Sequence, residues 1–167
     1  DLSHHVKRGG RVIGICGGYQ MLGRTVADPL GLEGAPVTVE GLGLLDVDTV
    51  MAAEKTLRNS RAHSLDFDVA LSGYEIHLGV TEGPDRARAP VAIDGRPDGA
   101  GSPDERIAGT YLHGLFSSDA FRQRLLESFG ITGGGIDYRG LVDAALDDVA
   151  ADLERHLSAE WLKTFLG

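Results

Sequence analysis

The chain has 167 residues, of which 42% are hydrophobic and 25% charged, a composition typical of one globular domain. Its formal net charge of −9 argues against nucleic acid or an anionic membrane as a partner, because both carry negative charge. A single cysteine excludes an internal disulfide and suits a reducing compartment. No apolar run approaches the ~20 residues that a membrane-spanning helix needs. We therefore expect a cytoplasmic protein without a membrane partner.

The N-terminal part predicts a helix, a buried strand and a second helix. Residues 1–8 form a predicted short helix, and the β-branched run 11–15 is typical of a strand inside an α/β sheet. The second helix begins within residues 19–22. The chain starts without methionine, directly before this strand, so we expect it to be a piece of a longer protein.

Cys16 stands between this strand and the second helix, with Gly17 and Gly18 directly after it. On such a sharp turn a side chain projects above the carboxyl edge of the sheet, as the nucleophile of an elbow does. The helix N-terminus favours the thiolate form, and the backbone N–H of Gly17 can bind an oxyanion. A lone cysteine is more often a small buried hydrophobe. Its glycine neighbours favour a catalytic thiol.

The middle of the chain predicts short strands separated by turns. Within one predicted strand the alternation places Asp66 and Asp68 on one face and Phe67 and Val69 on the other. A turn is expected at 28–31, a loop at 31–39 and exposed turns at 82–89 and 94–105, where glycine, proline and aspartate gather. The predicted strands are 42–50, 56–61, 63–71 and 73–81.

The C-terminal part predicts one more strand and three helices. The strand 106–112 ends at His113, in the position where α/β enzymes place functional groups. A serine-capped helix is expected to run to Phe129, and an amphipathic helix is expected over 137–157. A short helix over 160–166 carries Trp161 and Phe165. Leucines and aromatic residues at helical spacing are typical of core or interface.

Cys16 and His113 are the predicted catalytic pair. The imidazole would take the thiol proton, the thiolate would attack a carbonyl carbon, and the imidazolium would protonate the leaving group. Parallel topology can bring two strand ends to one edge of the sheet. His4 and His5 are adjacent and point to different faces, so we expect no metal site.

Four motifs in order resemble the glutamine amidotransferase domain of the cobyric acid synthase family, a cobalamin-pathway branch of the class I (cysteine-type) glutaminases. The resemblance runs from about residue 9 to the C-terminus. It implies an α/β fold, flavodoxin-like with a mostly parallel sheet and flanking helices, here lacking its first strands. Residues 1–167 would be the glutaminase domain of a longer two-domain protein, at its C-terminal end. The motifs span residues 14–23, 41–45, 73–77 and 109–116.

The same resemblance implies the roles of several residues and partners. Cys16 would attack the glutamine carboxamide with His113 as base, and Gln20 and Tyr19 would line the glutamine pocket. His77 would face that pocket or only pack. This domain would need no cofactor, because ATP and Mg²⁺ would act in an N-terminal synthetase domain. There the released ammonia would amidate four peripheral carboxylates of a corrinoid, adenosylcobyrinic acid a,c-diamide.

The chain departs from the wider class I pattern in two places. Most class I glutaminases carry a glutamate two positions after the catalytic histidine, where this chain has Leu115. The cobalamin branch similarly lacks it, which predicts weak isolated activity or another acceptor. Glu75, which is also predicted to bind substrate, is the candidate acceptor, with a structural hydrogen bond as its alternative role. The glycine-bearing oxyanion loop is expected before Asp1. A sheet edge exposed by missing strands would favour dimerisation or aggregation.

Several alternatives stay open. The lipid II amidotransferase subunit resembles this chain at the elbow but typically reads Glu-Asn-His-Gly where this chain has Glu75-Ile-His-Leu78. The a,c-diamide synthase usually has glutamate before the cysteine, where this chain has Ile15. A cysteine hydrolase of the same fold, acting on peptides or small carbonyls, is a further possibility. The last is a docking domain without activity of its own.

Overall fold

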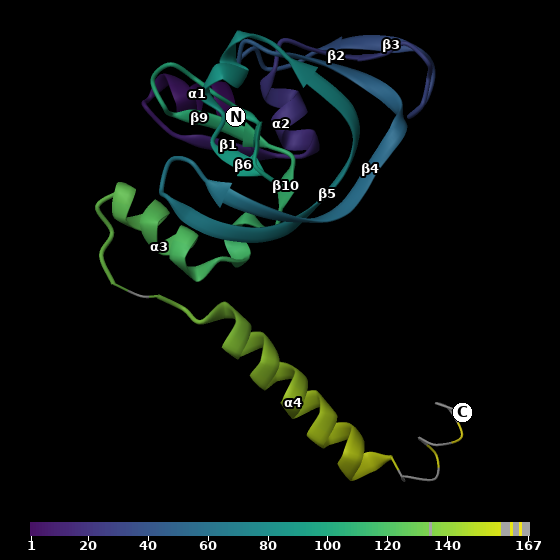
Figure 1. Ribbon diagram of the computed structural model, residues 1–167, viewed down its shortest axis with the longest axis vertical. Helices are drawn as coiled ribbons and strands as arrows, with labels where there is room; N and C mark the ends of the chain where they lie inside the picture. The colour runs from purple at the N-terminus through teal and green to yellow at the C-terminus, as the bar shows by residue number, and fades with distance from the viewer. Residues whose placement is uncertain (134, 158–160, 162–163, 165–167) are drawn as a thin grey trace.

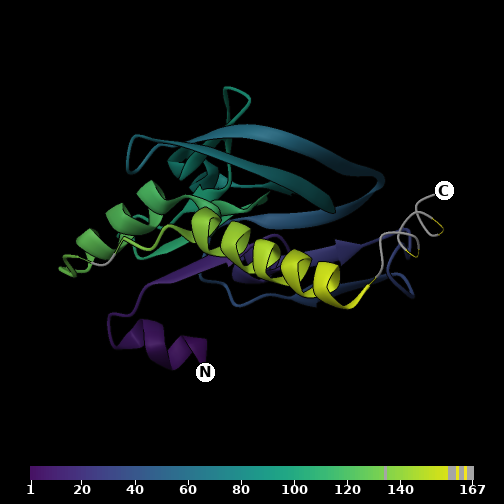
Figure 2. The same cartoon turned by 90° about the horizontal axis from the view of Figure 1, so that it is seen from below.

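The computed structural model describes residues 1–133, 135–157, 161 and 164, and it shows mixed β-sheets with helices around them (Figure 1). The predicted α/β class is confirmed. In the first sheet, β1 (Val12–Ile15) pairs in parallel with β9 (Ile107–Thr110), and β8 (Ala100–Gly101) pairs antiparallel with β9. Helices α1 (Leu2–Lys7) and α2 (Gly17–Leu22) flank β1 in the chain, as predicted. Figure 2 shows α1 at the rim of the molecule.

The second sheet has seven strands and is mainly antiparallel. The expected mostly parallel sheet is therefore wrong for the described residues, where only β1–β9 and β2–β4 are parallel. Parallel neighbours need a crossover of about a dozen residues or more, and most connections here are too short. The strands of this sheet are β2 (Thr25–Asp28), β3 (Val37–Glu40), β4 (Asp48–Ser64), β5 (Val69–Glu82), β6 (Val91–Ile93), β7 (Arg96–Asp98) and β10 (Leu112–His113).

The hairpin of β4 and β5 replaces the separate strands predicted between residues 42 and 81. Residues 42–47 precede β4 as irregular chain, and the turn 65–68 interrupts the predicted strand 63–71. Asp68 lies in this turn with a φ of 55°, a conformation that aspartate tolerates better than most residues. The predicted alternation of Asp66 and Phe67 across a strand is therefore wrong.

Short strands also occupy two segments that were expected to be irregular. β3 lies in the predicted loop 31–39 and pairs with β2, which the sequence did not reveal. β7 and β8 lie in the predicted exposed turn 94–105, and Ala100 is fully buried. Gly101 permits this burial because a Cβ there would lie 2.7 Å from the Arg88 carbonyl oxygen.

The buried side chains form two clusters, and the segment from β9 to the short helix after β10 contributes to both. The first cluster lies around α2 and the first sheet, and the second lies under the hairpin. The clusters are Tyr19, Leu22, Leu45, Val47, Ala100, Ile107 and Tyr111, and Leu71, Val91, Ile93, Leu112, Leu115 and Phe121. This shared segment holds β1 and the hairpin next to each other.

The C-terminal helices differ in how they pack. Helix α3 (Asp119–Ser128) confirms the predicted serine cap, because the Ser118 hydroxyl accepts the Phe121 N–H at 3.3 Å. Helix α4 (Tyr138–His156) confirms the predicted amphipathic helix but has no buried residue, and Figure 1 shows it extending away from the sheets. Of the two roles typical of such spacing, core or interface, the structure does not show the first for α4. Most of the predicted helix 160–166 lies outside the described residues.

We predict that the 167-residue chain associates with itself through the exposed apolar side chains of α4. This apolar stripe comprises Leu141, Leu146, Val149 and Leu153, each between 48% and 61% exposed. Because burying a leucine contributes about 1.5–3 kcal/mol, the change Leu146→Glu with Leu153→Glu should weaken association by at least about tenfold. Light scattering over a concentration series measures the association constant of each variant.

The control places the same charges on the opposite face of α4, at the exposed Ala144 and Ala151. The change Ala144→Glu with Ala151→Glu should leave the association constant close to that of the original chain. Equal weakening by both pairs would show that charge alone, and not the apolar stripe, governs association.

Candidate catalytic site

Cys16 lies on the sharp turn that the sequence predicts between β1 and α2. Its φ of 54° and ψ of −117° are unusual for a residue other than glycine, and such strain gathers at functional sites. Its backbone N–H donates to the Thr110 carbonyl of β9 at 3.0 Å, and its own carbonyl accepts the Gln20 N–H at 3.1 Å. These two hydrogen bonds fix the turn to the neighbouring strand β9 and to helix α2.

Glycine at position 14 makes this turn possible. A Cβ at Gly14 would lie 2.7 Å from Leu22 Cδ1 and 2.8 Å from the backbone carbonyl carbon of Gly18. Only glycine therefore lets the first turn of α2 rest on β1. On the outer side, a Cβ at Gly17 would meet no atom within 4 Å. Gly17 is the first residue of α2, so its N–H has no acceptor within the helix.

The Cys16 thiol is half-buried and donates to the backbone carbonyl of Ile76 on β5 at 3.2 Å. His113 reaches the same strand two residues away, because β10 pairs antiparallel with β5 and sets His113 opposite Tyr74. In the part of the chain that the structure describes, no hydrogen bond joins the thiol to the imidazole. Both groups therefore meet β5, and direct transfer of a proton between them stays a prediction.

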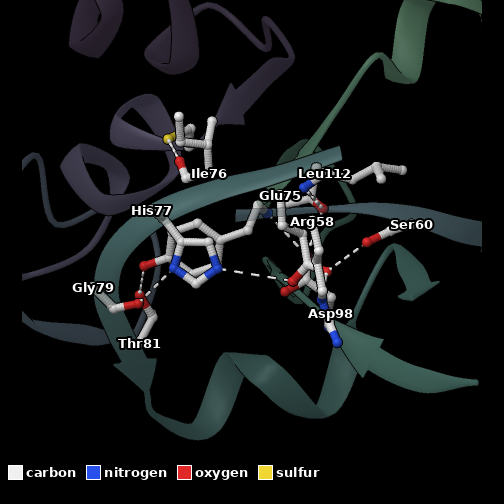
Figure 3. Close-up of polar contacts among 12 residues, drawn as sticks. Arg58, Ser60, Glu75, Ile76, His77, Gly79, Thr81, Asp98 and Leu112 are labelled. Atoms are coloured by element: carbon white, nitrogen blue, oxygen red, sulfur yellow. Dashed lines mark hydrogen bonds and ion pairs between the residues drawn. The ribbon is translucent and has the colours of Figure 1, made fainter. Parts of the chain in front are cut away.

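Glu75 does not orient His113, contrary to the expectation from sequence. Its carboxylate accepts from Arg58 Nε at 2.7 Å and from Ser60 Oγ at 2.8 Å, and it is 6% exposed. Neighbouring residues on a strand face opposite sides, so Glu75 lies across β5 from Tyr74 and Ile76. Figure 3 shows the Glu75 carboxylate meeting Arg58 and Ser60, with His77 on the same side of the strand.

Glu75 is held in its charged form. Burial raises the pKa of this carboxyl, but the hydrogen bonds from Arg58 and Ser60 and the guanidinium charge outweigh it, so the pKa lies below its ordinary value. A lowered folded-state pKa stabilises the fold above the ordinary value, and this contribution is lost as pH falls through the folded-state pKa.

Glu75→Gln should therefore destabilise the domain by about 1.5–3 kcal/mol at pH 7, the range for hydrogen bonds to charged groups. The difference from the original protein should shrink as the pH falls from the ordinary glutamate pKa of about 4.3 through the lowered folded-state pKa, where the carboxyl in the original protein also becomes neutral. Urea denaturation at a series of pH values measures this difference in the free energy of unfolding. Glu82→Gln is the control, because that side chain is 71% exposed in its ion pair with Arg86. A difference that stays constant with pH would refute the assigned cause.

His77 packs on the inner side of β5. Its ring stacks on Tyr111 with centroids 3.8 Å apart and planes at 16°, and Nδ1 lies 2.9 Å from the Gly79 carbonyl oxygen. Its Nε2 is 3.8 Å from Glu75 Oε2. The Tyr111 hydroxyl lies 2.6 Å from Thr81 Oγ1 and accepts from the Gln20 amide at 3.2 Å. The Gln20 amide is thus engaged by Tyr111 in this structure.

Tyr19 is 1% exposed and packs edge-on against Tyr111, with centroids 5.2 Å apart. Among the described residues its hydroxyl has no hydrogen-bond partner, and burial raises its pKa. Tyr19, Glu75 and His77 line one pocket of about 150 Å³ together with Asp98 and Tyr111. The structure therefore gathers three of the four residues predicted to bind substrate around one pocket, whose lining does not include Cys16.

Comparison with known proteins identifies the family. Residues 1–121 match the family model of the CobB/CobQ-like glutamine amidotransferase domain. The chain belongs to this family. The resemblance that four short motifs carried is thereby confirmed.

All 167 residues of the chain are also similar to proteins named cobyric acid synthase. The identity is 67% to the protein of Rhizobium meliloti (strain 1021), 66% to that of Sinorhizobium fredii and 64% to that of Rhizobium etli. Each match covers 100% of this chain and 34% of the relative. The chain thus spans about a third of the length of these relatives, and α4 lies within the similarity although the family model ends at residue 121.

Sequence reasoning missed three residues of the candidate site: Tyr74, Asp98 and Tyr111. Tyr74 and Tyr111 lie inside the motifs 73–77 and 109–116, so the motifs held the signal. Asp98 accepts the Tyr111 N–H at 2.9 Å from a segment expected to be an exposed turn. Within the described ranges, no group of three or more metal-binding side chains was found, and no helix has the length and apolarity to cross a bilayer.

Proposed function

We propose that this domain is the glutaminase of a cobyric acid synthase, with Cys16 as the nucleophile. The observation that carries the proposal is the placement of the only cysteine on a strained turn between β1 and α2, in a chain 67% identical to a cobyric acid synthase. A thiol at a strand-to-helix turn is exposed to substrate while its backbone is fixed.

The proposed reaction is acyl transfer through a thioester. His113 takes the thiol proton, and the Cys16 sulfur forms a bond to the carboxamide carbon of glutamine. The Gly17 N–H donates to the oxygen that becomes negative. The C–N bond then breaks, and His113 returns the proton to the nitrogen, which leaves as ammonia. Water attacks the thioester, releasing glutamate and the free thiol.

The pocket beside α2 supports the proposed binding of glutamine. Tyr19, Glu75 and His77 would surround the substrate, and the Gln20 amide would exchange its bond with Tyr111 for one with the ligand. Tyr19 and Glu75 are buried, so a polar ligand there meets few competing waters. A buried hydroxyl without a partner, such as that of Tyr19, gains most from a ligand atom that can hydrogen-bond.

The use of the ammonia belongs to the rest of the protein. We propose that ATP and Mg²⁺ act outside this domain, which itself would need no cofactor. We propose that a synthetase domain N-terminal to this chain binds both in the cytoplasm. That domain would amidate four peripheral carboxylates of adenosylcobyrinic acid a,c-diamide, a corrinoid. The full-length relatives named cobyric acid synthase support this acceptor over lipid II.

The test uses the full-length protein with glutamine, ATP, Mg²⁺ and adenosylcobyrinic acid a,c-diamide. We expect one glutamate for each amide formed, and no amidation when lipid II replaces the corrinoid. Glutamate release without any amidation of the corrinoid would overturn the proposed acceptor. Hydrolysis of peptides or small esters in preference to glutamine would instead identify a cysteine hydrolase.

A further inference from the structure

Within the part of the chain that the structure describes, His113 lacks the polar partner that usually orients a catalytic imidazole. Its Nε2 is buried and has no hydrogen-bond partner there. A general base needs a fixed ring as well as a nearby proton, because a misplacement of about 1 Å can cost about a hundredfold in rate. Some other contact must therefore hold the ring.

Neither of the two positions at which a carboxylate could orient His113 supplies that contact. Leu115 occupies the position two residues after His113 and is 3% exposed, packed in the hydrophobic cluster under the hairpin. The Glu75 carboxylate is taken by Arg58 and Ser60.

Tyr74 makes the ring contact that the structure records for His113. The two rings are stacked with centroids 4.7 Å apart and planes at 10°. Tyr74 is 45% exposed, so it contributes little to the core, yet its position is set by strand pairing. A flat stack leaves the ring edge, which carries both nitrogens of the imidazole, free of the tyrosine.

The backbone on both sides of this pair is also fixed. A Cβ at Gly73 would lie 1.9 Å from the His113 carbonyl oxygen, so only glycine lets β10 approach β5 here. Gly114 has a φ of 85°, in the left-handed region, and turns the chain directly after His113. Strand β5 therefore contacts His113 in two ways: the backbone at Gly73 packs against the backbone of His113, and the Tyr74 ring stacks on its imidazole.

We propose that Tyr74 is a positioning residue that holds the His113 imidazole by stacking, in the role that a carboxylate fills in most class I glutaminases. The inference rests on the proposed function, in which His113 moves the thiol proton. The stack fixes the plane of the ring and leaves Nε2 unpaired until substrate is bound. The tyrosine hydroxyl has no part in this role.

The test compares Tyr74→Phe, Tyr74→Leu and Tyr74→Ala in the full-length protein, with glutamate release as the readout. Tyr74→Leu and Tyr74→Ala should lower kcat about tenfold to a hundredfold and change KM by less than about threefold. Tyr74→Phe keeps the aromatic face and should restore kcat to within about threefold of the original. Tyr138→Ala, which removes an equally exposed tyrosine stacked over Arg122, should leave both constants unchanged.

The outcomes separate this inference from the proposed function. If the original protein releases glutamate and His113→Ala abolishes release, unchanged kcat in Tyr74→Ala and Tyr74→Leu overturns the inference alone. Loss of activity in Tyr74→Phe equal to that in Tyr74→Ala also overturns it, because the hydroxyl would then be responsible. No effect of His113→Ala on release would overturn both.

Discussion

Cys16→Ala should abolish glutamine-dependent amidation by the full-length protein while sparing amidation supported by added ammonium. Without the sulfur no thioester forms, and removal of a covalent nucleophile costs at least about 10⁴-fold in kcat. External ammonia bypasses the glutaminase step, so the ammonium-supported rate should stay within about threefold. Glutamate release and corrinoid amidation, measured in parallel, check both statements.

Met21→Leu is the matched control for this substitution. Met21 also carries sulfur, lies in helix α2 directly after Cys16 and is 57% exposed, so its replacement should leave both rates unchanged. Equal loss of the glutamine and ammonium rates in Cys16→Ala would indicate damage to the fold. Retention of glutamine-dependent amidation would remove Cys16 from the mechanism.

Gly14→Ala should destabilise the domain and inactivate the glutaminase together. The added Cβ would overlap Leu22 Cδ1 at 2.7 Å and the Gly18 backbone at 2.8 Å, and backbone cannot rotate away as a side-chain end can. Overpacking of this kind costs about 1–3 kcal/mol or more. Because α2 must shift to relieve the overlap, Cys16 moves with it, and we expect kcat to fall about a hundredfold.

Urea denaturation and glutamate release measure these two effects. Gly34→Ala is the control, because a Cβ at Gly34 meets no atom within 4 Å and its φ is not in the left-handed region. It should change neither stability nor kcat appreciably. Gly14→Ala with the stability and activity of the original protein would contradict the packing described for the turn.

The turn at Cys16 could be predicted from sequence because its determinants are local. A β-branched run, two glycines and a helix start are adjacent in the chain, and together they predict a strand, a sharp turn and a helix. The pairing of strands was not predictable in the same way. Parallel and antiparallel strands share residue preferences. The long hairpin of β4 and β5 could therefore be predicted only by recognising the turn 65–68.

In the candidate site too, residue types could be predicted from sequence but contacts between distant segments could not. Cys16 and His113 stand out by residue type and position, whereas the acceptor of the thiol is the backbone carbonyl of Ile76, which has no signature in sequence. The stack of Tyr74 on His113 depends on the register of β10 against β5. Periodicity likewise predicted helix α4 correctly, but periodicity cannot show whether its apolar face is covered.

The most direct test of Cys16 as the nucleophile of a glutamine site is covalent labelling by 6-diazo-5-oxo-L-norleucine, an electrophilic mimic of glutamine. Intact-mass measurement of the full-length protein should show one label per chain at Cys16, prevented by excess glutamine and absent in Cys16→Ser. Iodoacetamide reports whether the thiol can be reached at all. Alkylation of Cys16 by iodoacetamide without labelling by the glutamine mimic would contradict a glutamine site at this thiol.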